Sequence, residues 1–142
     1  MSDTSYSNEL FNVLIERSER LTSLVLKYVP NDKPITILDL GCGTGDQALA
    51  LADALPQARI IGLDISRPNI ELAEQKRREH HACDRIHFME TDYMHFVHEP
   101  FDVIFSWGVL HLIPVPTAKL CAKLARDLKP NGLFLNTMPY DC

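Results

Sequence analysis

The sequence predicts an α/β fold: a three-layer, doubly wound and mostly parallel sheet with strand order 3-2-1-4-5, preceded by an N-terminal helix. Two observations predict it. From residue 35 onward, short apolar runs alternate with amphipathic segments of helical period, as in strands joined by crossover helices. The first run leads directly into Gly41-Cys42-Gly43-Thr44-Gly45, where glycine allows positive φ and close approach of the backbone to a ligand.

The elements follow in order along the chain. Apolar residues at helical spacing over 8–28 predict an amphipathic helix that ends before Pro30 and covers one side of the sheet and the ligand mouth. Strands are predicted over 36–40, 59–63, 86–91, 101–106 and 133–137. Helices are predicted over 46–55, from Ser66 to about His80, and from Thr117 to Leu128, with a short segment at 93–98. Pro68 marks a helix start, and Lys129-Pro130-Asn131-Gly132 closes the last helix.

Composition predicts a single soluble domain over 1–142, with a helix or lid at 1–30 and a ligand-binding core at 35–139. Of the 142 residues, 46% are apolar and 23% charged, which is ordinary for a globular protein. No 18-residue apolar run exists and the N-terminus lacks signal-peptide features, so we expect a cytoplasmic protein without a membrane partner. The net charge of −5 offers no electrostatic footprint for nucleic acid.

Cysteine and histidine patterns predict no metal site. The four cysteines form no C-x-x-C pair, so we expect free thiols at Cys42, Cys83, Cys121 and Cys142. Cys42, inside the glycine turn, is expected to be a small side chain that lets the turn form. The histidine pairs lack a companion cysteine or acid at a recognised spacing; these pairs are His80-His81 and His95-x-x-His98.

Acidic residues close the second and third strands. Asp64 follows the second strand, where a carboxylate can take both ribose hydroxyls of a nucleoside. Asp92 follows the third, a position equally typical of a helix N-cap. Asp46 stands where a dinucleotide fingerprint needs glycine or alanine, and a carboxylate at a helix N-terminus repels phosphate. The turn therefore favours an uncharged or cationic ligand.

Five motifs in register resemble those of class I S-adenosylmethionine-dependent methyltransferases. They are ILDLGCGTGD at 37–46, GLDIS at 62–66, ETDY at 90–93, FDVIFSWGVLHLI at 101–113 and LKPNGLFL at 128–135. The resemblance covers residues 35–139. It implies S-adenosyl-L-methionine as cofactor, S-adenosyl-L-homocysteine as its product, and a small-molecule methyl acceptor.

The resemblance also implies which residues bind the cofactor. An acidic rim suits a cationic donor, and Asp39 can orient the glycine turn and the amino end of the ligand. Backbone groups line the methionine part, from Gly41, Cys42, Gly43, Gly45 and, through its carbonyl, Ser106. The adenosine part is held by the Asp64 carboxylate on the ribose, by Ile65 on the adenine face, and by Asp92 with the Tyr93 backbone at the adenine edge.

Methyl transfer from a sulfonium is an in-line displacement with a neutral leaving thioether, so the protein's main task is to hold donor and acceptor together and exclude water. A general base is needed only where the acceptor loses a proton. His111, after the fourth strand, is the candidate base. A histidine packed beside Leu110 and Leu112 is the alternative.

The chain stops after the fifth strand, whereas members of the family usually continue with a helix and a reversed sixth and seventh strand. The fifth strand is then an exposed edge, so we expect a homodimer or a fragment of a longer chain. Two alternatives stay open. One is a non-catalytic cofactor-binding module or partner subunit with an incomplete acceptor site; the other is an aminopropyl transferase or a nicotinamide-dependent dehydrogenase, and Asp46 weighs against the dehydrogenase.

Overall fold

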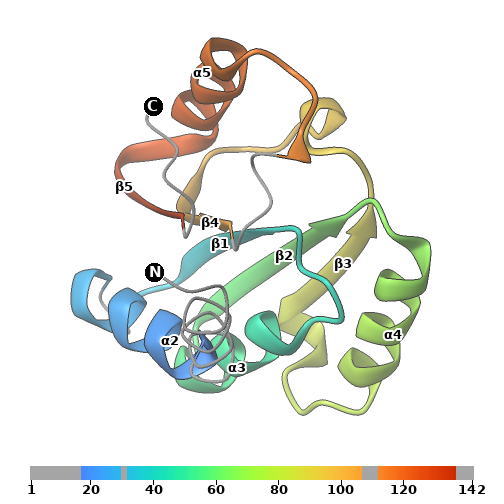
Figure 1. Ribbon diagram of the computed structural model, residues 1–142. Helices are drawn as coiled ribbons and strands as arrows, with labels where there is room; N and C mark the ends of the chain where they lie inside the picture. Colours follow the sequence, from blue (N-terminus) through green and yellow to red (C-terminus); the bar gives the residue numbers. More distant parts are fainter. Residues whose placement is uncertain (1–16, 30–31, 107–111, 137–142) are drawn as a thin grey trace, which may run out of the picture.

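The computed structural model describes residues 17–29, 32–106 and 112–136, with side chains from residue 22 onward (Figure 1). It confirms the predicted α/β fold. Five strands form one sheet in the order β3-β2-β1-β4-β5, and every neighbouring pair is parallel. The strands are β1 Ile35–Leu40, β2 Ala58–Asp64, β3 Ile86–Glu90, β4 Phe101–Ser106 and β5 Leu128–Asn136.

Helices cover both faces of the sheet and give the molecule three layers (Figure 1). On one face lie α2 Arg17–Tyr28, α3 Asp46–Ala54 and α4 Arg67–Arg78; on the other lies α5 Thr117–Asp127. Two short 3₁₀ turns, η1 Cys83–Arg85 and η2 Tyr93–His95, flank β3. No helix in the described part of the chain is long and apolar enough to cross a bilayer.

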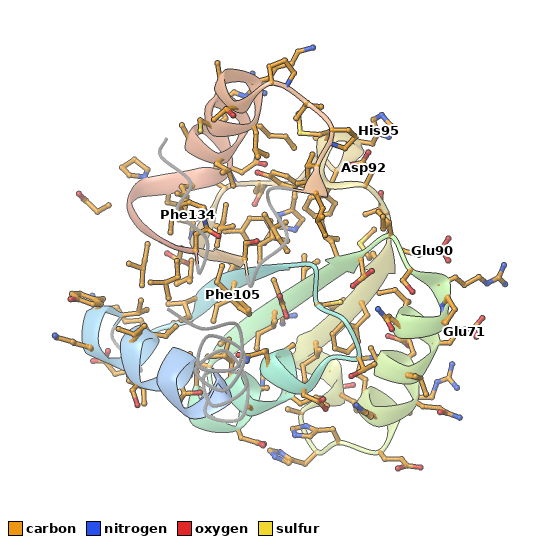
Figure 2. All side chains as sticks on the ribbon, in the orientation of Figure 1. Glu71, Glu90, Asp92, His95, Phe105 and Phe134 are labelled. Atoms are coloured by element: carbon orange, nitrogen blue, oxygen red, sulfur yellow. The ribbon has the colours of Figure 1, made fainter. Side chains whose placement is uncertain are left out.

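Alternation along the strands divides the buried side chains into two cores. Successive strand residues point to opposite faces, so Ile37 packs in the core under α2 and α3, whereas Leu38 packs in the core under α5. Phe105 and Phe134 likewise contribute to opposite cores (Figure 2). Burial on both faces holds the sheet rigid and fixes where the carboxyl ends of its strands lie.

The last strand differs from the prediction. β5 begins at Leu128, directly after α5, and the expected turn at 129–132 is a bulge inside the strand. In the register with β4, Leu128 pairs with Phe101 and Leu133 with Val103. Residues 129–132 of β5 therefore lie opposite a single residue of β4, Asp102. Asn131 accommodates the bulge with a φ of 66°. The turn chemistry was recognised correctly, but it interrupts a ladder instead of separating two elements.

Candidate functional site

The glycine turn wraps from the end of β1 onto the end of β2. Gly41, Gly43 and Gly45 all have positive φ, at 72°, 56° and 89°. The N–H groups of Gly41 and Cys42 both donate to the carbonyl of Leu63, at 2.8 and 2.9 Å. The expected left-handed backbone is therefore present, and its first half is anchored to the neighbouring strand.

Glycine is needed for different reasons at Gly43 and Gly45. A Cβ on Gly45 would lie 2.7 Å from the Phe88 ring, so glycine there is required by packing. A Cβ on Gly43 would meet nothing within 4 Å, so this position faces open space that a ligand can fill. Gly62 of β2, which the sequence analysis did not single out, is also a packing glycine, since its Cβ would lie 2.8 Å from that of Cys42.

Asp64 joins the turn to the following helix. Its Oδ2 accepts the N–H of Gly43 at 2.9 Å, and its Oδ1 accepts the N–H of Ser66 at 2.8 Å. Ser66 in turn is the N-cap of α4 and accepts the N–H of Asn69. Each carboxylate oxygen has a further lone pair, so Asp64 can organise the turn and still accept hydrogen bonds from a ligand.

Asp92 caps the 3₁₀ turn η2. Its Oδ1 accepts the N–H of Met94 at 2.9 Å, which confirms the helix-cap alternative for one of its two oxygens. Its side chain lies just beyond the end of β3 (Figure 2). The capping role and a ligand role are compatible, because Oδ2 is not used in the cap.

A pocket of about 230 Å³ lies at the carboxyl edge of the sheet, and Gly43 and Gly45 are not among the residues that line it. Among the predicted residues, Gly41, Asp64, Ile65, Asp92 and Tyr93 line it. The sequence analysis missed the others, which are Leu40, Leu63, Thr91, Leu112, Ile113 and Pro114. Ile65, which lines the pocket, is 78% exposed. The pocket is therefore mainly apolar, with two carboxylates at its rim.

Unpartnered polar groups lie near the glycine turn. Gln47, the second residue of α3, is 3% exposed, and neither its Nε2 nor its Oε1 has a hydrogen-bond partner among the described residues. The same holds for Oγ of the fully buried Ser106 at the end of β4. Buried polar atoms without partners are costly, so these groups call for a polar ligand or water. A glutamine in phase with the buried Leu51 of the same helix was the sequence signal for Gln47.

Other predicted residues have less to offer chemically. Asp39 is buried at the end of β1, beside Gly62 and Phe105 in the strand register. Burial, with help from nearby carboxylates, raises the pKa of the Cys42 thiol far above its usual range, so the thiol stays protonated and is a poor nucleophile. The candidate base His111 lies outside the described residues.

The expectation of four free thiols is wrong, because Cys121 is not a free thiol. Cys42 and Cys83 are free, whereas Cys121 on α5 is disulfide-bonded. Disulfide pairing depends on which residues meet in the fold, and sequence spacing alone does not reveal it.

A histidine cluster lies away from the pocket, at the far end of α3. His80 and His81 place their Nε2 atoms 3.0 and 2.6 Å from Oδ1 of Asp53, a companion acid that sequence spacing did not reveal. Nδ1 of His80 accepts the N–H of Ala82 at 3.0 Å. These contacts join α3 to the segment after α4, and the potential ligand atoms of Asp53, His80 and His81 all lie within 4.8 Å of one another.

Comparison with known proteins agrees with this geometry. The family described as methyltransferase domain matches residues 37–132. A trans-aconitate 2-methyltransferase of Azoarcus sp. is 35% identical over 120 residues, which cover 82% of this chain and 45% of that protein. The chain thus spans about half the length of this relative.

Two solved structures share the fold. One is a methyltransferase from Geobacter sulfurreducens in complex with S-adenosyl-L-homocysteine, with a TM-score of 0.70 at 24% identity, over 85% of this chain and 47% of that one. The other is the [4+2]-cyclase SpnF, with a TM-score of 0.70 at 31% identity, over 80% and 42% of the two chains. With the family match over most of the sheet, the chain belongs to the class I S-adenosylmethionine-dependent methyltransferases.

Proposed function

We propose that this chain binds S-adenosyl-L-methionine and supports methyl transfer to a small-molecule acceptor, mainly by proximity and orientation. The observation that carries the proposal is the glycine turn, held by Asp64, with open space at Gly43 beside an apolar pocket. The proposal also takes residues 35–139 as the cofactor-binding core.

The residues present fit the cofactor at both of its ends. At the adenosine end, the Asp64 oxygens have lone pairs for the ribose hydroxyls, and the exposed Ile65 gains an apolar partner in adenine. The second oxygen of Asp92 and the Tyr93 backbone can read the edge of the base.

At the methionine end, the cationic sulfonium and the polar amino-acid group are proposed to lie near the buried Asp39 and the turn residues. Backbone groups of Gly41, Cys42, Gly43 and Gly45, with the Ser106 carbonyl, are proposed to line this part. Gln47 is added to them, because its unpartnered amide would gain hydrogen bonds there.

When bound, the cofactor supplies an electrophilic methyl group on a sulfonium with a neutral leaving group. The chain's own residues then bind the donor and the acceptor, orient them toward each other and exclude water from the site. This raises the effective concentration of the acceptor. Where an acceptor loses a proton, His111 is the proposed base. Its equal alternative is a packing role.

Calorimetric titration with S-adenosyl-L-methionine and S-adenosyl-L-homocysteine tests the first half of the proposal, and a screen of small-molecule acceptors tests the second. The screen begins with trans-aconitate, because the Azoarcus relative is named for it. Turnover supports methyl transfer. If neither ligand binds, the proposal is refuted.

Binding without turnover would favour the second candidate, a cofactor-binding module that is not itself a methyltransferase. The specific observation in its favour is the similarity to SpnF, which is named as a cyclase.

A further inference from the structure

We infer that Lys123 and Asp127 of α5 are positioning residues that hold the segment 92–96 in place and thereby set the selectivity of the pocket for the base of the cofactor. The inference rests on the proposed function, and it concerns how the opposite face of the sheet controls the adenine end of the site.

A closed set of contacts joins α5 to the pocket wall. The Tyr93 hydroxyl donates to Oδ2 of Asp127 at 2.6 Å, and Lys123 Nζ forms an ion pair with the same oxygen at 3.1 Å. Lys123 Nζ also donates to the carbonyl of Phe96 at 2.7 Å and lies 4.6 Å from the centroid of the Tyr93 ring. The segment is therefore held at both ends by one ammonium and one carboxylate.

This arrangement is an unusual way to pack a helix. Lys123 is only 7% exposed and lies beside the buried Leu124 and one turn from the buried Leu120, where an apolar side chain would suffice for packing. A buried ion pair adds little net stability, because desolvation of the two charges offsets their attraction. The contribution of these contacts is positional precision, because each donor and acceptor fixes the position of its partner within a few tenths of an ångström.

Tyr93 connects the contacts made by α5 to the wall of the pocket. Burial, together with the Asp127 carboxylate, raises the pKa of the Tyr93 hydroxyl well above its usual range, so it stays a hydrogen-bond donor. Its side chain points into the core under α5, while the residue itself lines the pocket next to Asp92. Since η2 is only three residues long, its own hydrogen bonds do not fix its position, and the contacts from α5 do.

The consequence concerns the edge of the base. Asp92 uses Oδ1 to cap η2, so the place of its other oxygen follows the place of the turn. A loosened turn would misplace this acceptor relative to an exocyclic amine, while the ribose contacts of Asp64, which depend on Gly43 and Ser66, would stay intact. Base selectivity, and not overall affinity alone, is therefore the property that Lys123 and Asp127 control.

The test compares two probes, S-adenosyl-L-homocysteine and S-inosyl-L-homocysteine, in which a carbonyl oxygen replaces the exocyclic amine. We expect the parent chain to prefer the adenosyl probe by about tenfold or more, the factor contributed by one well-aligned hydrogen bond to a charged acceptor. In Lys123→Met the ratio of the two dissociation constants should fall toward one. Lys119→Met, an exposed lysine one turn away on α5, should keep the parent ratio.

Tyr93→Phe keeps the ring and removes only the hydroxyl, so it tests the same idea if Lys123→Met does not fold, and it should also lower the ratio. A merely structural role predicts that both variants have lower thermal stability and an unchanged ratio of the two dissociation constants. That result would overturn this inference and leave the proposed function intact. A parent chain that binds neither probe would overturn the proposed function as well.

Discussion

Replacing Asp64 with alanine removes a carboxylate that has two kinds of neighbour. In the structure its oxygens accept the N–H groups of Gly43 and Ser66 at 2.9 and 2.8 Å. Under the proposed function, the same oxygens use their remaining lone pairs for the ribose hydroxyls of the cofactor. The variant therefore changes both the free energy of binding and the free energy of unfolding, and the two effects are measured separately.

The size of the binding effect follows from the charge of the acceptor. A hydrogen bond to a charged group contributes about 1.5–3 kcal/mol net. Water replaces part of what is lost at this half-buried position, so we expect the equivalent of one such bond to be missing. The dissociation constant for S-adenosyl-L-homocysteine should rise by about 10- to 150-fold, because about 1.4 kcal/mol is a factor of ten. The free energy of unfolding should fall by about 1–2 kcal/mol, since the two N–H groups turn to water.

Calorimetric titration measures the first effect, and chemical unfolding of the same samples measures the second. Asp46→Asn is the matched control, because it also removes one negative charge next to the glycine turn. Asp46 is exposed, does not line the pocket, and pairs with Lys76 at 2.9 Å. Its dissociation constant should stay within about twofold of the parent value, as expected for an exposed pair.

A ligand analogue that lacks the ribose 2′-hydroxyl separates direct contact from loosening of the turn. The parent chain should bind this analogue more weakly than S-adenosyl-L-homocysteine, whereas Asp64→Ala should discriminate much less, because the partner of the hydroxyl is gone. Equal discrimination by the two proteins, with the variant folded, would refute the assignment of Asp64 to the ribose.

Three further predictions concern the turn, the sheet edge and acid stability. Gly43→Val should abolish cofactor binding, because φ is 56° there and the added methyls would enter open space next to the pocket; a folded variant with unchanged titration would show that the turn is only structural. β5 is an outer strand of the described sheet, so we expect a second copy or further chain to cover it; a monodisperse monomer by light scattering, with freely exchanging β5 amides, would contradict this. Burial raises the pKa of Asp102, but the N–H of Thr36 and the Lys129 ammonium outweigh it and hold the pKa below its ordinary 3.8. The charged carboxylate of Asp102 therefore stabilises the fold above pH 3.8, and this contribution is lost as the pH falls through the lower pKa of the folded state. Asp102→Asn should lower the Tm more at neutral pH than at about pH 3. Equal decreases in Tm at the two pH values would contradict this prediction.

Much of the fold followed from local patterns. Alternating apolar runs and helical periods predicted the strand order, because parallel strands joined by right-handed crossovers leave few topologies open. The last strand was placed too late, since a Pro-Asn-Gly sequence has the same local signature in a bulge as in a turn.

The candidate site divides in the same way. Asp64 and Asp92 were placed from sequence because each lies at or just after the end of a strand, and the carboxyl ends of parallel strands meet at one edge; Ile65 followed from the family resemblance. The sequence did not reveal the additional structural roles of these residues. One such role is the hydrogen bond that the Asp64 carboxylate accepts from the N–H of Gly43.

By itself, then, the sequence determined the sheet, the glycine turn and the acidic strand ends, since backbone preference and hydrophobic period act over a few residues. Only the tertiary structure decided that Gln47 is buried with no hydrogen-bond partner among the described residues, and that Lys123 and Asp127 contact Tyr93. Those facts depend on which side chains meet after the crossovers place distant segments together. Local spacing carries no record of such meetings, because the hydrogen bonds that define them join residues on separate elements of the fold.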